Sequence, residues 1–234
     1  MNKIISYSLA FVHMGWALSL IIDSSRYLGK LAYPPIFSAL HILIALVLAL
    51  NSVVGGVLST VVMAYYWVAV KPLEPIAEPQ SVGILFLSAS LLAPLMRSRL
   101  TPHNLQLLGL RLGIAYPYLE WGLDAFRNPL HFYEYITQNP ATSFLATQGL
   151  IEETVILLGS LELLLALTIS FGFAVRPFSA LSLAVLTVFM VVAGYPLALP
   201  QNIALAAASL ILVKNGGGEY SIQSAPRLLG VLMR

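Results

Sequence analysis

The chain has 234 residues, of which 59% are hydrophobic and only 9% are charged, and its formal net charge is +2. A soluble domain carries about 25% charged residues, so this composition excludes a soluble enzyme, a nucleic-acid-binding protein and a disordered chain. It predicts an all-α integral membrane protein in contact with lipid. The sequence contains no cysteine, which excludes disulfides, iron–sulfur clusters and thiolate metal sites. Redox chemistry would therefore need a bound organic cofactor, haem on histidines, or a partner subunit.

Eight stretches are apolar enough to predict transmembrane helices, since one crossing needs about 20 apolar residues. They cover residues 4–22, 35–51, 53–70, 81–96, 105–126, 150–175, 178–195 and 198–213. The second and third stretches are separated by a turn at Asn51 and the glycines that follow it, and the sixth and seventh by a turn at Arg176-Pro177. These two tight turns leave six or seven spans as alternatives.

The distribution of basic residues predicts the orientation of these spans. With eight spans, the side that holds both termini carries eight of the twelve Lys and Arg residues. They are Lys3, Arg97, Arg99, Arg111, Arg176, Lys214, Arg227 and Arg234. The excess of positive charge on the cytoplasmic side of membrane proteins then predicts a multi-pass protein of the cell membrane with both termini in the cytoplasm. The aromatic-rich connection 128–148 would lie outside.

The two halves of the sequence resemble each other in chain order. The matches are 48–55 with 165–172, 79–82 with 200–203, His13 with Glu120, and Pro34 with Pro140. Chance similarity between apolar helices is the alternative, but four ordered matches favour a duplication. The predicted organisation is a diverged first four-helix repeat over 1–100, a second over 101–222, and a cytoplasmic tail over 223–234. Such repeats would be parallel, related by an axis along the membrane normal.

Several short motifs in the second half carry a family resemblance. They are Leu-Arg-Leu-Gly at 110–113, Glu-Trp-Gly at 120–122, Leu-Gly-Ser-Leu-Glu-Leu at 158–163, Gly172, Arg176-Pro177, and Lys-Asn-Gly-Gly-Gly at 214–218. Over residues 105–222 the chain resembles the DoxX-like family of small four-helix membrane proteins, which includes the DoxD subunit of archaeal thiosulfate:quinone oxidoreductase. The resemblance implies association with a quinone-linked redox complex. The first half places Ile4 and Ala45 opposite the second half's Arg111 and Glu162, so a site built on those charges would exist once.

Two charges lie deep inside predicted spans. A charge in the bilayer interior costs about 2.5–3.5 kcal/mol on insertion scales and therefore faces a partner or a cavity. Arg111 and Glu162 lie level to within about one helical turn on adjacent antiparallel spans. We expect them to form an ion pair, either a structural pin between two helices or a substrate-binding pair, with the structural role favoured.

Four carboxylates near the predicted outer surface suggest a proton acceptor. Glu120 and Asp124 share one helix face, and Glu152 and Glu153 begin the next span. Like charges and burial raise the pKa of a carboxyl group, as a base beside a quinol requires. Glu120 is the candidate acceptor, with Asp124 beside it. The alternative for Asp124, Glu152 and Glu153 is that they are helix ends at the headgroups.

Aromatic and histidine residues complete the candidate site. Tyr116, Tyr118 and Trp121, together with His13, are candidates to line a quinone cleft, although aromatic residues also form interfacial belts. His13 and His41 are the two histidines within predicted spans, but haem is disfavoured because no surrounding pattern supports its ligation. No metal site is expected.

The expected function is therefore that of a quinone-interacting membrane subunit of a respiratory or sulfur-oxidising electron-transfer complex. Quinone is the expected cofactor, and other membrane subunits are the expected partners. One alternative is a non-catalytic accessory subunit of a larger complex such as a terminal quinol oxidase. Another is a small transporter, suggested only by the repeat.

Overall fold

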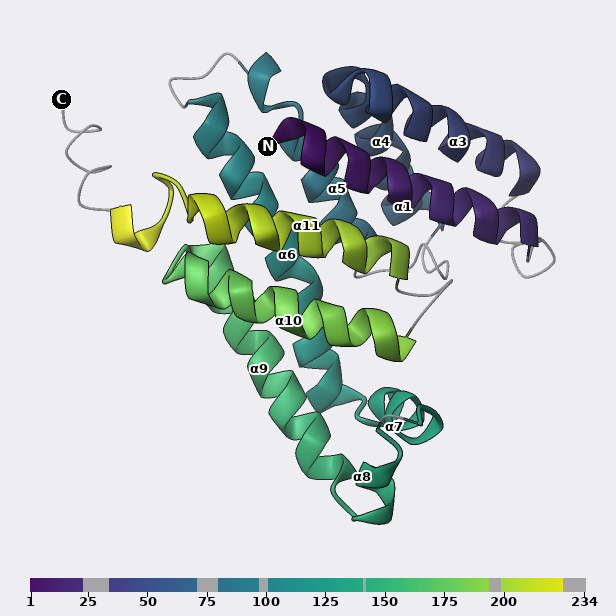
Figure 1. Cartoon of the computed structure of the whole chain (residues 1–234), viewed down its shortest axis with the longest axis vertical. Coiled ribbons are helices and arrows are strands. Elements are labelled where there is room, and N and C mark those ends of the chain that lie inside the picture. Colours follow the sequence, from purple (N-terminus) through teal and green to yellow (C-terminus); the bar gives the residue numbers. More distant parts are fainter. Residues whose placement is uncertain (23–33, 71–79, 97–100, 141, 194–198, 225–234) are drawn as a thin grey trace.

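The computed structural model describes residues 1–22, 34–70, 80–96, 101–140, 142–193 and 199–224, and it is all-α over these residues. Eight helices form the body of the molecule (Figure 1). They are α1 (Asn2–Ile22), α3 (Pro34–Leu50), α4 (Ser52–Tyr65), α5 (Gln80–Ser90), α6 (Pro102–Arg127), α9 (Ile151–Phe171), α10 (Val175–Ala193) and α11 (Leu199–Asn215). The π-helix η1 (Tyr66–Val70) continues α4. The short elements are η2 (Ala93–Leu95), α7 (Leu130–Gln138), α8 (Phe144–Thr147) and η3 (Ile222–Ser224).

Four helical segments are long and apolar enough to cross a membrane. They are Asn2–Ile22, Ser52–Ala69, Ile151–Phe171 and Val175–Val192. Two shorter apolar helices, Pro34–Leu50 and Ser81–Ser90, lie among them. These segments confirm an all-α protein with candidate membrane spans, because each apolar stretch satisfies its backbone hydrogen bonds within a helix, as hydrocarbon requires.

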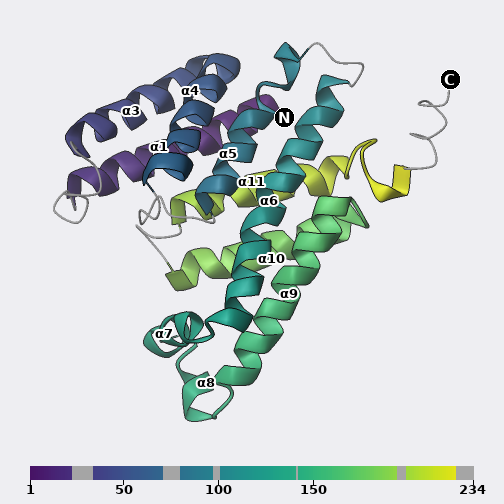
Figure 2. The same ribbon diagram turned by 180° about the vertical axis from the view of Figure 1, so that it is seen from behind.

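The eight helices pack as an inner and an outer set. The inner helices α1, α5, α6 and α11 contribute most of the buried residues, and α1 packs along α11 as α5 packs along α6. The outer helices α3 and α9 pack along α1 and α6, while α4 and α10 pack along α5 and α11. Figure 2 shows α4 and α5 between α3 and α6. The start of α1 and the end of α11 lie at the same end of the molecule (Figure 1).

The predicted turn between the second and third apolar stretches is present. Asn51 adopts an extended conformation (φ −142°), and its side-chain oxygen accepts the backbone N–H groups of Val53 and Val54 at 3.1 Å. This is N-capping by an asparagine, which satisfies backbone donors that have no partner in the helix. Gly55 then allows α4 to approach α3, because a Cβ there would lie 2.6 Å from the Cα of Leu48.

The predicted break between the sixth and seventh stretches lies earlier in the chain than expected. Helix α9 ends at Gly172, which has a left-handed φ of 76°, and Ala174 follows with a φ of 42°. Helix α10 then begins at Val175, so Arg176 and Pro177 lie inside its first turn. Proline is tolerated there because the first N–H groups of a helix have no acceptor within it. The expectation that Arg176-Pro177 breaks the helix is therefore wrong.

The connection 128–148 contains helices that were not expected. Helix α7 has an apolar face, and its Ile136 is buried against Ala125 of α6 and Val155 of α9. Leu130 and Phe144 remain exposed. Helices α7 and α8 lie together at the end of the α6–α9 pair (Figure 1). The tail 225–234, the loop 71–79, and Arg97 and Arg99 lie outside the described residues, so the predicted orientation stays a prediction.

Candidate functional site

The first half of the molecule buries a connected set of polar side chains. His13 lies on α1, His41 on α3, Ser59 on α4, Tyr66 at the start of η1, and Ser88 on α5. The two imidazoles and the two serines are wholly buried, and Tyr66 is 3% exposed. Because polar groups are costly in an apolar interior unless they are hydrogen-bonded, each of these side chains needs a partner. The structure supplies one to each.

The five side chains form one unbranched set of hydrogen bonds, here named the histidine chain. The Nδ1 atoms of His13 and His41 lie 2.7 Å apart. The Nε2 of His13 lies 2.8 Å from the Oγ of Ser59, and the Nε2 of His41 lies 2.7 Å from the hydroxyl of Tyr66. The Oγ atoms of Ser59 and Ser88 lie 2.6 Å apart. The histidine chain thus connects α1, α3, α4, η1 and α5.

The direction of its hydrogen bonds follows from the Ser88 end. The hydroxyl of Ser88 donates its one hydrogen to the carbonyl oxygen of Ile84 at 2.8 Å, so Ser59 has to donate to Ser88. Because the hydrogen of Ser59 is then used, the Nε2 of His13 has to donate to Ser59. A neutral imidazole carries a single N–H, so the Nδ1 of His13 is an acceptor.

The same rule fixes the tautomer of His41. With the Nδ1 of His13 as acceptor, the Nδ1 of His41 is the donor, and its Nε2 accepts the hydroxyl hydrogen of Tyr66. With both histidines neutral, all donors therefore point the same way, from Tyr66 towards Ser88. Every ring nitrogen already has a hydrogen-bonding partner, so neither imidazole presents a free nitrogen to haem iron in this arrangement.

Aromatic rings enclose the histidine pair. The indole of Trp16 meets the rings of His13 and His41 edge-on, with ring centroids 5.7 Å away in both cases. Tyr66 stacks on His41 at 5.5 Å and is the first residue of the π-helix. A π-helical turn is uncommon and frequently occurs at functional sites. In this buried environment of low dielectric constant each hydrogen bond is strong, and an unpaired polar atom would be costly.

A second, shorter set of hydrogen bonds lies in the other half, here named the serine chain. The hydroxyl of Tyr118 on α6 donates to the carbonyl oxygen of Ser182 on α10, and the hydroxyl of Ser182 donates back to that of Tyr118, both at 3.1 Å. The Oγ of Ser182 lies 3.0 Å from the Oγ of Ser209 on α11, and Ser209 donates to the carbonyl oxygen of Leu205 at 3.0 Å. Tyr118, a predicted quinone-cleft residue, is thus a buried contact between three helices.

Arg111 is 1% exposed and donates only to backbone carbonyls. Its Nε donates to Ile169 at 2.9 Å, and its Nη2 donates to Ser170. Its Nη1 donates to Gly217 at 3.0 Å and to Tyr220 at 2.8 Å. No N–H group within a helix donates to its last carbonyls, so the guanidinium can cap the end of α9. Its bonds to Gly217 and Tyr220 also hold the segment after α11 against α6.

The predicted ion pair between Arg111 and Glu162 is therefore wrong. Glu162 is 0% exposed, and neither of its carboxyl oxygens has a hydrogen-bond partner among the described residues. The arginine reaches instead for carbonyls about two helical turns further along α9. The predicted depths in the membrane put the two side chains at similar levels. They could not show that backbone carbonyls at the end of α9 would bind the guanidinium instead.

The predicted outer carboxylates do not share one environment. Asp124 accepts hydrogen bonds from Asn128 at 2.7 Å and from the Nδ1 of His131 at 2.9 Å. Glu152 and Glu153 are exposed in the first turn of α9, where the helix dipole favours negative charge. Glu120 is partly exposed on α6. Its role as a proton acceptor stays a prediction.

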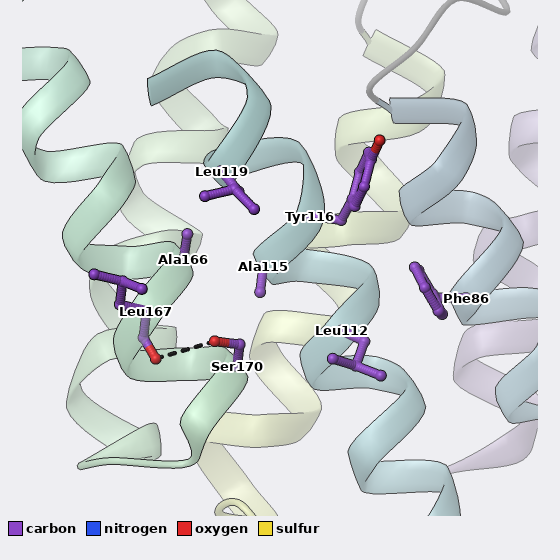
Figure 3. Close-up of a pocket in the computed structure, with 8 residues that line it drawn as sticks. All are labelled: Phe86, Leu112, Ala115, Tyr116, Leu119, Ala166, Leu167 and Ser170. Atoms are coloured by element: carbon purple, nitrogen blue, oxygen red, sulfur yellow. Dashed lines mark hydrogen bonds between the residues drawn. The ribbon is translucent and has the colours of Figure 1, made fainter. Parts of the chain in front are cut away.

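Two grooves open on the apolar surface. The first, of about 160 Å³, lies between α5, α6 and α9 (Figure 3). Its lining residues are Phe86, Leu112, Ala115, Tyr116, Leu119, Ala166, Leu167 and Ser170. The second groove, of about 390 Å³, lies between α1, α3 and α11. Its lining residues are Phe11, Met14, Gly15, Ala17, Leu18, Ile21, Ile42, Leu199 and Pro200.

The four residues predicted to bind the cofactor lie in different places. Tyr116 lines the first groove, whereas Tyr118 belongs to the serine chain and His13 to the histidine chain. Trp121 packs edge-on against Tyr118 at 5.8 Å and Phe189 at 5.7 Å.

Sequence reasoning missed two members of the histidine chain, Ser59 and Ser88, and it did not connect Tyr66 with the histidines. Serines are common in apolar helices, so only the two intramembrane histidines gave a usable signal.

No protein-family model matches the chain, and neither a curated protein nor a solved structure matches it.

Proposed function

We propose that this chain is a quinone-interacting subunit of a membrane electron-transfer complex, in which the histidine chain accepts protons. The observation that carries the proposal is the buried pair of neutral imidazoles, His13 and His41, whose tautomers are fixed by their neighbours. Histidine is the side chain that proteins most often use to relay protons. Burial without a counter-ion among the described residues disfavours a lasting imidazolium, so a proton would pass through the pair instead of staying there. A pair with a defined donor and a defined acceptor is prepared to take up one proton.

The hydrogen-bond directions support a route for that proton. The hydroxyl of Tyr66 can accept an incoming proton while it passes its own to the Nε2 of His41. The resulting imidazolium donates from its Nδ1 to the bare Nδ1 of His13, which shares the charge. Ser59 and Ser88 hold His13 in the accepting tautomer and are positioning residues.

The second groove, which neither histidine lines, supports a quinone at another face of the same two helices, α1 and α3. Met14 and Ile42 line it, and they directly follow His13 and His41 in the chain. Its lining is almost entirely apolar, which suits the flat ring and isoprenoid tail of a membrane quinone. A bound quinone supplies two-electron, two-proton redox chemistry, and the chain supplies the apolar contact surface and the proton acceptor.

We also propose that the fold is a tandem repeat of four helices, with α1, α3, α4 and α5 corresponding to α6, α9, α10 and α11. Support comes from hydrogen bonds at equivalent positions. Ser6 and Arg111 donate to the carbonyls of Leu48 and Ile169, His13 and Tyr118 bond to Ser59 and Ser182, and Ser88 and Ser209 donate to Ile84 and Leu205. The pairs are 105 residues apart in the first helix of each repeat, 121 in the second and fourth, and 123 in the third.

This register keeps the match of 79–82 with 200–203 but changes the others that the sequence suggested, and Arg111 now corresponds to Ser6 instead of Ile4. His13 corresponds to Tyr118 instead of Glu120, and the equivalent of Glu162 is His41 instead of Ala45. The packing also supports a two-fold relationship, since α11 packs along α1 as α5 packs along α6. We propose that all eight helices cross the bilayer, which adds α3, α5, α6 and α11 to the four long apolar segments.

The proposal is tested by the quinone that the purified chain retains. Leu18 lines the second groove and is 48% exposed, so Leu18→Trp fills the groove without disturbing the core. Leu46→Trp on α3 is the matched control, because Leu46 is 57% exposed and does not line the groove. We expect quinone in solvent extracts of the wild-type chain and of Leu46→Trp, and at least a several-fold loss in Leu18→Trp.

Two other results would contradict the proposal. Equal quinone in all three proteins would place any quinone outside the second groove. Absence of quinone from all three, together with copurification of the chain with other membrane subunits, would favour the accessory-subunit alternative.

A further inference from the structure

Glu162 is a carboxyl group in the interior of the molecule without a partner. It is 0% exposed, and neither oxygen has a hydrogen-bond partner among the described residues. It lies near the middle of α9, on the face that packs along α6. Arg111, the buried arginine of that neighbouring helix, donates four hydrogen bonds to backbone carbonyls and none to Glu162 among the described residues.

The surroundings of Glu162 are unfavourable for a negative charge. Two titratable groups on α6, Tyr118 and Asp124, interact electrostatically with Glu162. The first is a neutral phenol engaged with Ser182, and the second is itself an acid. An ionised carboxylate that is buried without a counter-ion or a donor is far more costly than the neutral acid. Binding a proton removes that cost.

We infer that Glu162 is a proton-binding site of the second half of the molecule, with a proton as its ligand. The carboxyl holds this proton as a neutral acid between α6 and α9. Ala166, one helical turn away on the same face of α9, lines the first groove between α5, α6 and α9 (Figure 3). This inference does not depend on a quinone, although the proposed repeat makes Glu162 the equivalent of His41 in the histidine chain.

Infrared spectroscopy of the purified chain tests the inference directly. A protonated carboxylic acid has a carbonyl band that an ionised carboxylate lacks. We expect this band in the wild-type protein at neutral pH and its loss in Glu162→Gln, which keeps the size of the side chain. Glu153→Gln is the matched control, because Glu153 is exposed in the first turn of the same helix α9. A wild-type spectrum without the band at neutral pH, or a band unchanged in Glu162→Gln, would overturn the inference.

A chemical test on the wild-type chain covers the case in which Glu162→Gln does not fold. A hydrophobic carbodiimide reacts with a protonated acid: the carboxyl oxygen bonds to the central carbon, and the proton moves to a nitrogen of the reagent. Peptide mapping at neutral pH should find Glu162 modified several-fold more than the exposed Glu152 and Glu153. Modification of Glu152 and Glu153 without modification of Glu162 would overturn the inference.

Discussion

His13 and His41 face each other through their Nδ1 atoms at 2.7 Å, and neither ring reaches the surface. One of the two nitrogens has to carry the hydrogen, and the serines beyond His13 decide which one does. The tautomer of a histidine on α3 is therefore set by a serine on α5, although no bond joins the two directly. Such dependence makes the hydrogen bonds of the histidine chain cooperative.

Replacing Ser59 with alanine should leave the Nε2 hydrogen of His13 without an acceptor. A buried donor without a partner costs about 1–3 kcal/mol, so the thermal unfolding temperature in detergent should fall. Nitrogen NMR of labelled histidine should show a changed mixture of tautomers at His13. Ser160→Ala is the control, because Ser160 is exposed and donates only within α9. An unchanged tautomer mixture in Ser59→Ala would contradict the directions assigned to the histidine chain.

Tyr65 and Tyr66 provide a neighbouring pair for testing proton entry. Tyr66 is 3% exposed and donates to His41, whereas Tyr65 is 47% exposed. Tyr66→Phe removes the hydroxyl through which a proton would enter, so quinone-dependent turnover of the native complex should fall at least tenfold. Tyr65→Phe should retain turnover close to that of the wild type. Similar turnover in both variants would show that protons do not pass through Tyr66.

Arg111→Leu should release the segment after α11. The substitution removes four hydrogen bonds to carbonyls, each of which contributes about 1.5–3 kcal/mol when the donor is charged. Limited proteolysis should then cut near Gly217 and Tyr220, which the wild-type protein protects. Adding Glu162→Leu should not restore protection, because Glu162 is no partner of Arg111. Recovery in the double variant would restore the ion-pair hypothesis.

The close contact between α6 and α9 depends on two glycines. A Cβ at Gly122 would lie 2.9 Å from the carbonyl oxygen of Gly159, and a Cβ at Gly159 would lie 2.6 Å from the Cβ of Ala125. Gly159→Val should force the helices apart and cost about 1–3 kcal/mol or more, measured by thermal unfolding in detergent. Ser160→Val on the exposed face of α9 should be nearly neutral. Equal unfolding temperatures for the two variants would refute this account of the contact.

Hydropathy predicted the helices well, because a long apolar stretch in a membrane has few alternatives to a helix. It placed the end of the sixth stretch at Arg176-Pro177, whereas the left-handed conformation of Gly172 ends α9 earlier. Periodicity also gave no sign of α7 within a connection that looked irregular. The apolar face of α7 is explained by the structure, in which Ile136 packs against Ala125.

The candidate site was less predictable than the fold. Arg111 and Glu162 were recognised as unusual, but Arg111 donates to backbone carbonyls, which have no sequence signature, and Glu162 has no hydrogen-bond partner among the described residues. His13 and His41 lie 28 residues apart and meet only because α1 and α3 pack side by side. A single sequence shows which residues could form such a site, but it does not show how the helices align to bring them together.

The contact between Gly15 on α1 and Pro200 on α11 has a consequence for biogenesis. A Cβ at Gly15 would lie 2.7 Å from the Cγ of Pro200, so the first and last helices of the body are in direct contact at this point. Pro200 is synthesised 185 residues after Gly15, which takes roughly 10 to 40 seconds at about 5–20 residues per second. During that interval the face of α1 that later meets α11 has to be covered by something other than α11. Completion of the inner four helices therefore has to wait until α11 has been synthesised.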